Sequence, residues 1–321
     1  MSFTREQARR LHDSLAAFDL KSPVVDDELT RAYLRHYGLA HLQAPWPLTH
    51  FFGSFTSGPF RLAGQFFAVP PENCRGTVVI VHGYYDHTGL FCHPIELCLS
   101  LGFSVLSFDL PGHGLSGGDP ASISSFDYYS QALVDCLRLA GQAGAAGPWS
   151  ILGQSTGAAA IINCLLDPQR YPLPAFHKIL LLAPLLQPVD WASGLVKYRF
   201  MRWFVKRVKR DFARNSHDDE FLHFIAGEDP LQARYLMVDW VRSLKAYLDK
   251  FAAAPRSQQP LHIIQGTEDT TVDWRYNLPK LVDKFPAART YLIEGARHHL
   301  VNESDQYRQQ VFKRIAMILT Q

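Results

Sequence analysis

Short apolar runs alternate with longer helical patterns through most of this chain, and this alternation limits the fold more than any other feature. The runs are rich in β-branched and aromatic residues and lie at 76–81, 103–108, 149–154, 176–184 and 260–266. Repeated strand–helix units imply a parallel sheet, because a crossover helix must return the chain before the next strand can run in the same direction. We therefore expect an α/β fold with a mostly parallel central sheet flanked by helices.

Three stretches depart from this alternation. We expect residues 1–50 to form a helical extension packed on the core, with helices at 4–20 and 26–39. The pattern of residues 49–71 predicts an antiparallel hairpin. Residues 185–254 are mostly helical, aromatic and basic, and they are too long for an ordinary loop. We expect a core of residues 51–184 and 255–321, with residues 185–254 inserted as a helical lid after the sixth strand.

Composition and charge exclude several classes of protein. The chain has 32 basic and 30 acidic residues, a net charge of +2, so its global charge does not favour a nucleic-acid partner. Its five cysteines form no CxxC pair and no zinc-like spacing with histidine, which favours reduced thiols and predicts no metal. The N-terminus lacks the apolar core of a signal peptide, so we expect a cytoplasmic protein. No feature of the sequence predicts the oligomeric state.

The segment GQSTG, residues 153–157, places Ser155 between two glycines where a predicted strand gives way to a predicted helix. This is the context of a nucleophile elbow, a strained turn in which side chains at 153 or 157 would crowd the backbone. A serine hydroxyl is a weak nucleophile and requires a base that is oriented by an acid. Both are expected after later strands, in the order acid and then histidine.

Two later segments offer these groups. Residues 260–273 contain Glu268, Asp269 and Asp273, and residues 292–303 contain the adjacent pair His298 and His299. Asp269 lies nearest the predicted strand end, whereas Asp273 is better suited to capping the next helix. One histidine of the pair should point into the site and the other away from it.

Five segments together resemble the α/β-hydrolase superfamily, and within it the branch of monoacylglycerol lipases, lysophospholipases and S33-type serine aminopeptidases. They are VHGYYDHTGLF (81–91), FDLPGHGLSGG (108–118), GQSTG (153–157), GTEDTTVD (266–273) and GARHHLVNE (295–303). These match the patterns HGxxxHxGxF/Y, DxxGHGxS, GxSxG, GxxD and GxxHxL in the order typical of that branch. The resemblance runs from about residue 60 to the C-terminus, excluding the lid, and implies the α/β-hydrolase fold.

The resemblance also implies roles for individual residues. Ser155 would be the nucleophile, Asp269 the orienting acid and His298 the base. The backbone N–H groups of Tyr84 and Thr156 would form the oxyanion hole. Further candidates for the substrate pocket are His82, Gly83, Gln154, Trp191 and Tyr198. In the same loops, Asp86, His87, Asp109 and His113 are expected to hold the backbone by hydrogen bonds.

The implied function is that of a serine hydrolase of carboxylic esters such as a monoacylglycerol, a lysophospholipid or a short acyl ester, without a cofactor. The same residues could serve a thioesterase, an acyltransferase or an aminopeptidase, and the fold can also form a non-catalytic ligand-binding module. Gln154 stands where this branch usually has histidine, and Thr156 stands where methionine is common. These two departures leave the substrate open.

The predicted lid contains the one local excess of positive charge. Residues 195–215 interleave lysines and arginines with aromatic and aliphatic side chains. Such a helix could lie peripherally on an anionic membrane, in the cell at the inner surface, with its apolar side buried. The alternative is a solvated basic face over aromatic residues that cover the acyl pocket or form a dimer contact.

Overall fold

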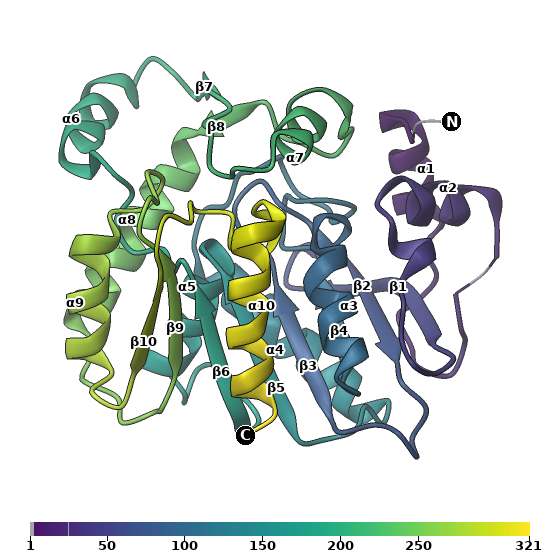
Figure 1. The fold of residues 1–321 in the computed structure, drawn as a ribbon. Coiled ribbons are helices and arrows are strands. Elements are labelled where there is room, and N and C mark those ends of the chain that lie inside the picture. The colour runs from purple at the N-terminus through teal and green to yellow at the C-terminus, as the bar shows by residue number, and fades with distance from the viewer. Residues whose placement is uncertain (1–2, 25) are drawn as a thin grey trace.

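The computed structural model describes residues 3–24 and 26–321, and in Figure 1 a twisted central sheet is covered by helices on both faces. The sheet has eight strands in the spatial order β1 (Thr49–Ser57), β2 (Phe60–Ala68), β4 (Ser104–Phe108), β3 (Thr77–Val81), β5 (Trp149–Gln154), β6 (Phe176–Leu182), β9 (His262–Gly266) and β10 (Arg289–Ile293). The β1–β2 and β2–β4 pairs are antiparallel and all the others are parallel. The predicted α/β fold with a mostly parallel sheet is confirmed.

Alternate side chains of the buried strands enter two hydrophobic clusters, one on each face of the sheet. In β3, Val79 and Val81 belong to the first cluster, and Val78 and Ile80 belong to the second. The first cluster is covered by α4 (Asp127–Gln142), α5 (Thr156–Leu166), α8 (Val238–Ala253) and α9 (Trp274–Lys284). The second is covered by α3 (Cys92–Ser100), α10 (Asp305–Leu319), α1 (Arg5–Ser14) and α2 (Glu28–His36). Burial on both faces explains why these strands are apolar at nearly every position.

The N-terminal extension packs against the antiparallel edge of the sheet. Helix α1 ends at Ser14, earlier than the predicted residue 20, because the chain beyond it pairs with β1. The N–H of Phe18 donates to the carbonyl of Ser54 at 2.8 Å, and the N–H of Ser54 donates to the carbonyl of Ala16 at 2.7 Å. These bonds supply partners for an edge strand that would otherwise be open.

The inserted segment, residues 185–254, lies above the edge of the sheet at which the parallel strands end (Figure 1). Its elements are α6 (Trp191–Met201), β7 (Arg207–Lys209), α7 (Asp219–His223), a π-helical turn (Phe224–Glu228), β8 (Tyr235–Met237) and α8. Strands β7 and β8 form a two-stranded antiparallel ribbon. The segment is therefore not wholly helical, and strands of three residues are too short to leave a period in the sequence.

A buried polar cluster fastens the inserted segment to both the N-terminal extension and the core. Asp229 accepts hydrogen bonds from Tyr37 Oη at 2.7 Å, Gln232 Nε2 at 2.9 Å and Leu231 N–H at 2.9 Å. His87 Nε2 lies 3.1 Å from its carboxylate. Burial acts to raise the pKa of Asp229, but His87 and the hydrogen bonds lower it to about 2. The carboxylate is thus charged at neutral pH, and its hydrogen-bond donors and His87 offset the cost of burying that charge.

Candidate active site

Ser155 occupies a sharp turn between β5 and α5. Its backbone has φ 53° and ψ −111°, a combination that residues with a side chain rarely adopt. A Cβ atom at position 157 would overlap the carbonyl oxygen of Val81, and one at 153 would lie 2.8 Å from the N atom of Ala158. Both flanking glycines are therefore required by the close approach of α5 to the neighbouring strands, as the motif predicts.

The structure brings the side chains of Ser155, His298 and Asp269 together. His298 Nε2 lies 3.0 Å from Ser155 Oγ, and His298 Nδ1 lies 2.7 Å from Asp269 Oδ2. All three residues are buried. With Nδ1–H donating to the carboxylate, Nε2 of the neutral ring is left as an acceptor facing the serine hydroxyl.

The carboxylate of Asp269 is held by several donors beyond the histidine. Its Oδ1 accepts from the N–H groups of Thr271 at 2.8 Å and Val272 at 3.0 Å, and its Oδ2 accepts from Gln265 Nε2 at 2.9 Å. Burial acts to raise the pKa of Asp269, but the charge of His298 and these hydrogen bonds leave it lowered. Asp269 is therefore ionised and fixed in orientation.

The other two acidic candidates lie elsewhere. Asp273 accepts from the N–H of Tyr276 at 3.1 Å and caps α9. Glu268 has a largely exposed side chain whose Oε2 lies 3.6 Å from His217 Nε2. Neither carboxylate is hydrogen-bonded to His298, so Asp269 alone of the three has the geometry expected of the orienting acid.

The carboxylate of Asp269 raises the proton affinity of His298. Burial acts to lower the pKa of His298, but the adjacent charge of Asp269 and its hydrogen bond outweigh burial and raise the pKa. An imidazole in this position can accept the proton of Ser155 and is stabilised as imidazolium once it has done so.

We expected the second histidine of the pair to point away from the site, but His299 lines it. It is buried, its Nε2 lies 3.0 Å from Asp86 Oδ1, and both residues line the same cavity as Ser155. Burial acts to raise the pKa of Asp86, but His299 lowers it to about 2. Sequence reasoning missed this second acid–histidine pair, although Asp86 in the HGYYDH segment and the doubled histidine were its visible signals.

The residues that carry the two candidate oxyanion donors belong to this cavity. Tyr84 and Thr156 are both part of its lining. Within residues 3–24 and 26–321, no oxygen accepts a hydrogen bond from either backbone N–H group. The side chain of Tyr84 is fixed separately, since its Oη donates to the carbonyl of Ala121 at 2.7 Å and its ring stacks on Trp240 with centroids 3.9 Å apart.

Three of the residues predicted for the substrate pocket, His82, Gly83 and Gln154, do not line the cavity at Ser155. His82 is buried, with Nδ1–H donating to the carbonyl of Gly83 at 2.8 Å and Nε2 accepting from the N–H of Leu110 at 2.9 Å. Burial lowers the pKa of His82 to about 3, so its ring is neutral. Gln154 Oε1 accepts from the N–H of Val301 at 3.4 Å. These contacts hold the turn after β3 and the segment after β10 against the sheet.

The other two residues predicted for the substrate pocket, Trp191 and Tyr198, line a neighbouring cavity. The cavity at Ser155 has a volume of about 330 Å³, and the one lined by Trp191 and Tyr198 has a volume of about 310 Å³. The two share walls made by Pro188, Val208, Leu236 and Trp240. The inserted segment therefore supplies a mostly apolar extension beside the candidate nucleophile.

The part of the chain that the structure describes has neither a metal-binding cluster nor a membrane-spanning helix. In that part of the chain no group of three or more histidine, cysteine, aspartate or glutamate side chains could hold a metal ion. None of its helices is both long and apolar enough to cross a bilayer. All five cysteines are free thiols.

Residues 72–305 match the protein family described as serine aminopeptidase, S33. The chain belongs to this family. Proteins that it resembles include the monoglyceride lipase homolog of Monkeypox virus, which is 25% identical over 252 residues, or 75% of this chain and 88% of that protein. The monoacylglycerol lipase of Mycolicibacterium smegmatis is 28% identical over 92 residues, or 29% of this chain and 33% of that protein. The predicted α/β-hydrolase family and the predicted enzyme class, an ester hydrolase, are confirmed.

Solved structures agree on the fold of this S33 protein. A soluble variant of monoglyceride lipase from Saccharomyces cerevisiae, in complex with a substrate analog, superposes with a TM-score of 0.68 at 18% identity, covering 83% of this chain and 92% of the other. Monoacylglycerol lipase from Paleococcus ferrophilus superposes with a TM-score of 0.65 at 20% identity, covering 80% of this chain and 99% of the other.

Replacing Asp269 by asparagine is expected to lower the pKa of His298, because the charge that raises it is removed while the burial that lowers it remains. NMR titration of the His298 imidazole measures this shift. Asp273→Asn, which changes a carboxylate that caps α9, is the matched control and should leave the pKa of His298 unchanged. An unshifted pKa in Asp269→Asn would contradict the electrostatic coupling described above.

Proposed function

We propose that this S33 protein hydrolyses carboxylic esters with Ser155 as nucleophile, His298 as general base and Asp269 as the acid that orients the histidine. The observation that carries the proposal is the continuous chain of contacts from Ser155 Oγ to His298, at 3.0 Å, and from His298 to Asp269, at 2.7 Å. A packed serine in a structural turn would not need an aligned imidazole whose proton affinity is raised by a buried carboxylate.

The reaction follows from these positions. His298 Nε2 takes the proton of Ser155 as its Oγ attacks the ester carbonyl, and the resulting oxyanion is stabilised by the free N–H groups of Tyr84 and Thr156. Collapse of this intermediate expels the alcohol, which receives the proton from His298. A water molecule, activated by the same histidine, then attacks the acyl-enzyme and releases the carboxylic acid.

The walls of the cavity support a substrate with a hydrocarbon portion. The shared apolar wall that continues toward Trp191 and Tyr198 suits an acyl chain, whereas Asp86 and His299 offer polar contacts for the alcohol portion. We therefore propose a monoacylglycerol, a lysophospholipid or a short acyl ester as the substrate class. The similarity to proteins named monoglyceride lipase supports the first of these.

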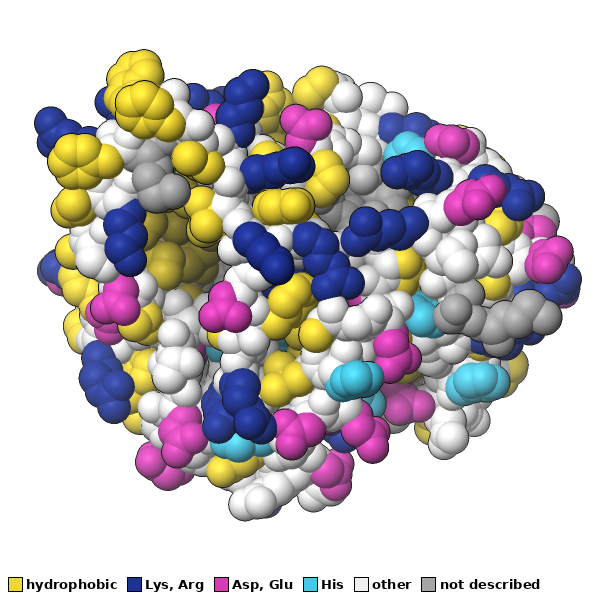
Figure 2. Space-filling view, turned by 90° about the horizontal axis from the view of Figure 1, so that it is seen from above, with side chains coloured by type: hydrophobic (Ala, Val, Ile, Leu, Met, Phe, Trp, Pro, Cys, Tyr) yellow, Lys and Arg dark blue, Asp and Glu magenta, His cyan; other side chains and the backbone are white. Residues whose placement is uncertain are grey.

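The inserted segment also exposes an apolar patch, defined here as Val196, Phe200, Trp203 and Phe204. Phe200, Trp203 and Phe204 are 71%, 75% and 87% exposed, so these aromatic residues do not cover the acyl pocket. In Figure 2 apolar and basic side chains gather together on the side of the molecule where α6 lies. We propose that this patch contacts the surface of an anionic membrane, from which a lipid substrate could enter the cavity.

Ser155→Ala is expected to lower kcat for ester hydrolysis by about a millionfold, which is the loss typical of removing the nucleophile from such a site. Steady-state assays with p-nitrophenyl acyl esters, a monoacylglycerol and a lysophospholipid measure the loss and rank the substrates. The matched control is Ser100→Ala, at an exposed position in α3. Unchanged turnover in Ser155→Ala would overturn the proposal and favour a non-catalytic module.

The membrane contact predicts that Trp203→Ser combined with Phe204→Ser weakens co-sedimentation with vesicles that contain anionic lipid, because the exposed rings no longer insert. The double variant should retain its turnover of water-soluble esters, since neither ring lines a cavity beside Ser155. Tyr276→Ser, which removes a 40% exposed aromatic ring on α9, away from the patch, is the control. Equal sedimentation of all three proteins would contradict the contact.

A further inference from the structure

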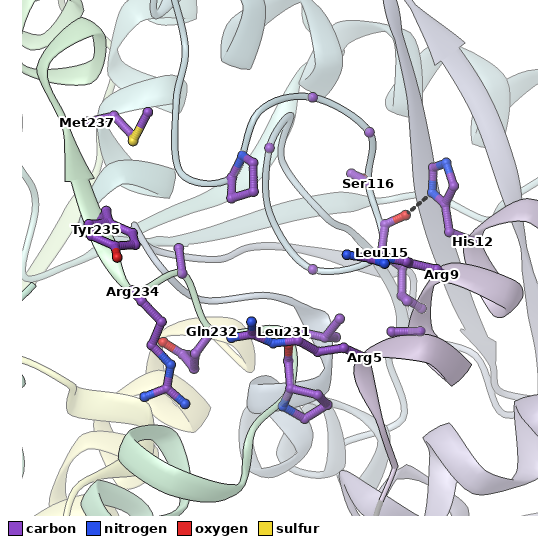
Figure 3. Close-up of a pocket in the computed structure, with 18 of the residues that line it drawn as sticks. Arg5, Arg9, His12, Leu115, Ser116, Leu231, Gln232, Arg234, Tyr235 and Met237 are labelled. Carbon is purple, nitrogen blue, oxygen red and sulfur yellow. Dashed lines mark hydrogen bonds between the residues drawn. The ribbon is translucent and has the colours of Figure 1, made fainter. Parts of the chain in front are cut away.

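A larger cavity, of about 680 Å³, lies apart from Ser155 and shares none of its lining with the catalytic cavity. Its walls come from three separate parts of the chain, namely α1, the loop of residues 112–120 and the inserted segment at Arg207, residues 230–235 and Met237. Figure 3 shows side chains of α1 extending toward Leu231 and Gln232 of the inserted segment. We call this the basic cavity.

Four arginines line the basic cavity, namely Arg5, Arg9, Arg207 and Arg234. The only acidic residue in the lining is Asp13. Over the described ranges 3–24 and 26–321, none of the four guanidinium groups lies within ion-pair distance of a carboxylate. The cavity therefore holds positive charge that the described chain does not neutralise.

Neighbouring groups hold three of these arginines and still leave donors free. Arg5 Nε donates to the carbonyl of Pro230 at 3.2 Å, and Arg234 Nη1 donates to the carbonyl of Ala226. The guanidinium of Arg207 lies over the ring of Tyr235 at 4.3 Å. Each guanidinium has five N–H donors, so one such contact restricts its orientation and leaves several donors for a ligand.

The choice of basic residue points to a particular ligand chemistry. All four cations in the lining are arginine, whereas the exposed basic face near α6 mixes arginine with lysine. The planar guanidinium fork binds phosphate through two parallel hydrogen bonds, which the lysine ammonium group cannot do. A phosphate monoester carries close to two negative charges at neutral pH and would neutralise two of the four cations.

The wall formed by residues 112–120 is held in place by several hydrogen bonds and is therefore suited to binding. Asp109 Oδ2 accepts from the N–H of Leu115 at 2.8 Å, and its Oδ1 accepts from the N–H of Thr88 at 2.7 Å. His12 Nδ1–H donates to the carbonyl of Leu115 at 2.6 Å, which is the contact drawn in Figure 3. A wall fixed before binding reduces the conformational entropy lost when a ligand is held.

The β7–β8 ribbon separates the basic cavity from the catalytic cavity. Val208 and Leu236, which face each other in the ribbon, line the cavity at Ser155. Arg207, Tyr235 and Met237, their direct neighbours along the two strands, line the basic cavity. Successive side chains of a strand point to opposite faces, so one ribbon forms a wall of both cavities.

We propose that the basic cavity is a second ligand site that binds a phosphate monoester and thereby joins α1 to the inserted segment. The ligand is either a soluble phosphorylated metabolite or the headgroup of a lipid such as phosphatidic acid, since both present the same dianion. The β7–β8 ribbon that forms one of its walls also lines the cavity at Ser155. The proposal concerns binding and stands whether or not Ser155 is the nucleophile.

Isothermal titration calorimetry on the full chain tests the proposal with inorganic phosphate and glycerol 3-phosphate at constant ionic strength. The Arg5→Gln and Arg9→Gln double variant should bind glycerol 3-phosphate at least about tenfold more weakly, because two charge-assisted hydrogen-bond donors are lost. The matched control, Arg199→Gln with Arg202→Gln, removes the same charge from the exposed face near α6 and should bind as the parent protein does. Ser155→Ala should also bind as the parent does, which separates this result from any failure of the proposed catalysis.

Binding to vesicles of phosphatidylcholine with and without phosphatidic acid distinguishes a lipid headgroup from a soluble phosphate ester as the ligand. If the ligand is a lipid headgroup, the Arg5 and Arg9 variant binds phosphatidic acid vesicles more weakly than the parent protein does. If the ligand is a soluble ester, the variant binds these vesicles as the parent does and loses only the calorimetric signal. Either result supports the site. No detectable binding of phosphate, glycerol 3-phosphate or phosphatidic acid, or an equal loss of glycerol 3-phosphate binding in the control variant, would overturn it.

Discussion

The close approach of α5 to the end of β3 is the constraint on which the site depends. Only a glycine at 157 allows it, because any Cβ atom there would overlap the carbonyl oxygen of Val81. Two hydrogen bonds to the end of β6 and the residues after it fix the strained backbone of Ser155. Its N–H donates to the carbonyl of Leu182 at 2.9 Å, and its carbonyl accepts from the N–H of Leu185 at 3.2 Å. Strain of this kind persists only where the surrounding structure over-determines it.

The parallel sheet then determines which side chains can reach the serine. Ser155, Asp269 and His298 each follow the carboxyl end of a strand, and the carboxyl ends of parallel strands share one edge. Residues 143 and 29 positions apart in the chain therefore meet within hydrogen-bond distance. The inserted segment covers the same edge and is fastened by the buried Asp229, which contacts Tyr37 and His87.

Much of this arrangement could be predicted from the sequence, because apolar runs and glycine-flanked turns are local signals. The strand–helix alternation predicted the sheet, and the predicted elbow, acid and histidine lie together in the structure. The Asp229 cluster, the pairing of His299 with Asp86 and the β7–β8 ribbon were not predicted. Each of these joins segments far apart in the chain through single polar side chains or three-residue strands, which leave no periodic pattern.

The central claim is that Ser155 forms a covalent bond to the acyl group of the substrate. The most direct measurement is tandem mass spectrometry of the protein after reaction with a long-chain alkyl fluorophosphonate, which traps an activated serine as a stable adduct. We expect one adduct on Ser155 of the parent protein and a much slower reaction in His298→Gln, because the base is lost. An unlabelled protein, or an adduct on another residue with Ser155 unmodified, would contradict the account.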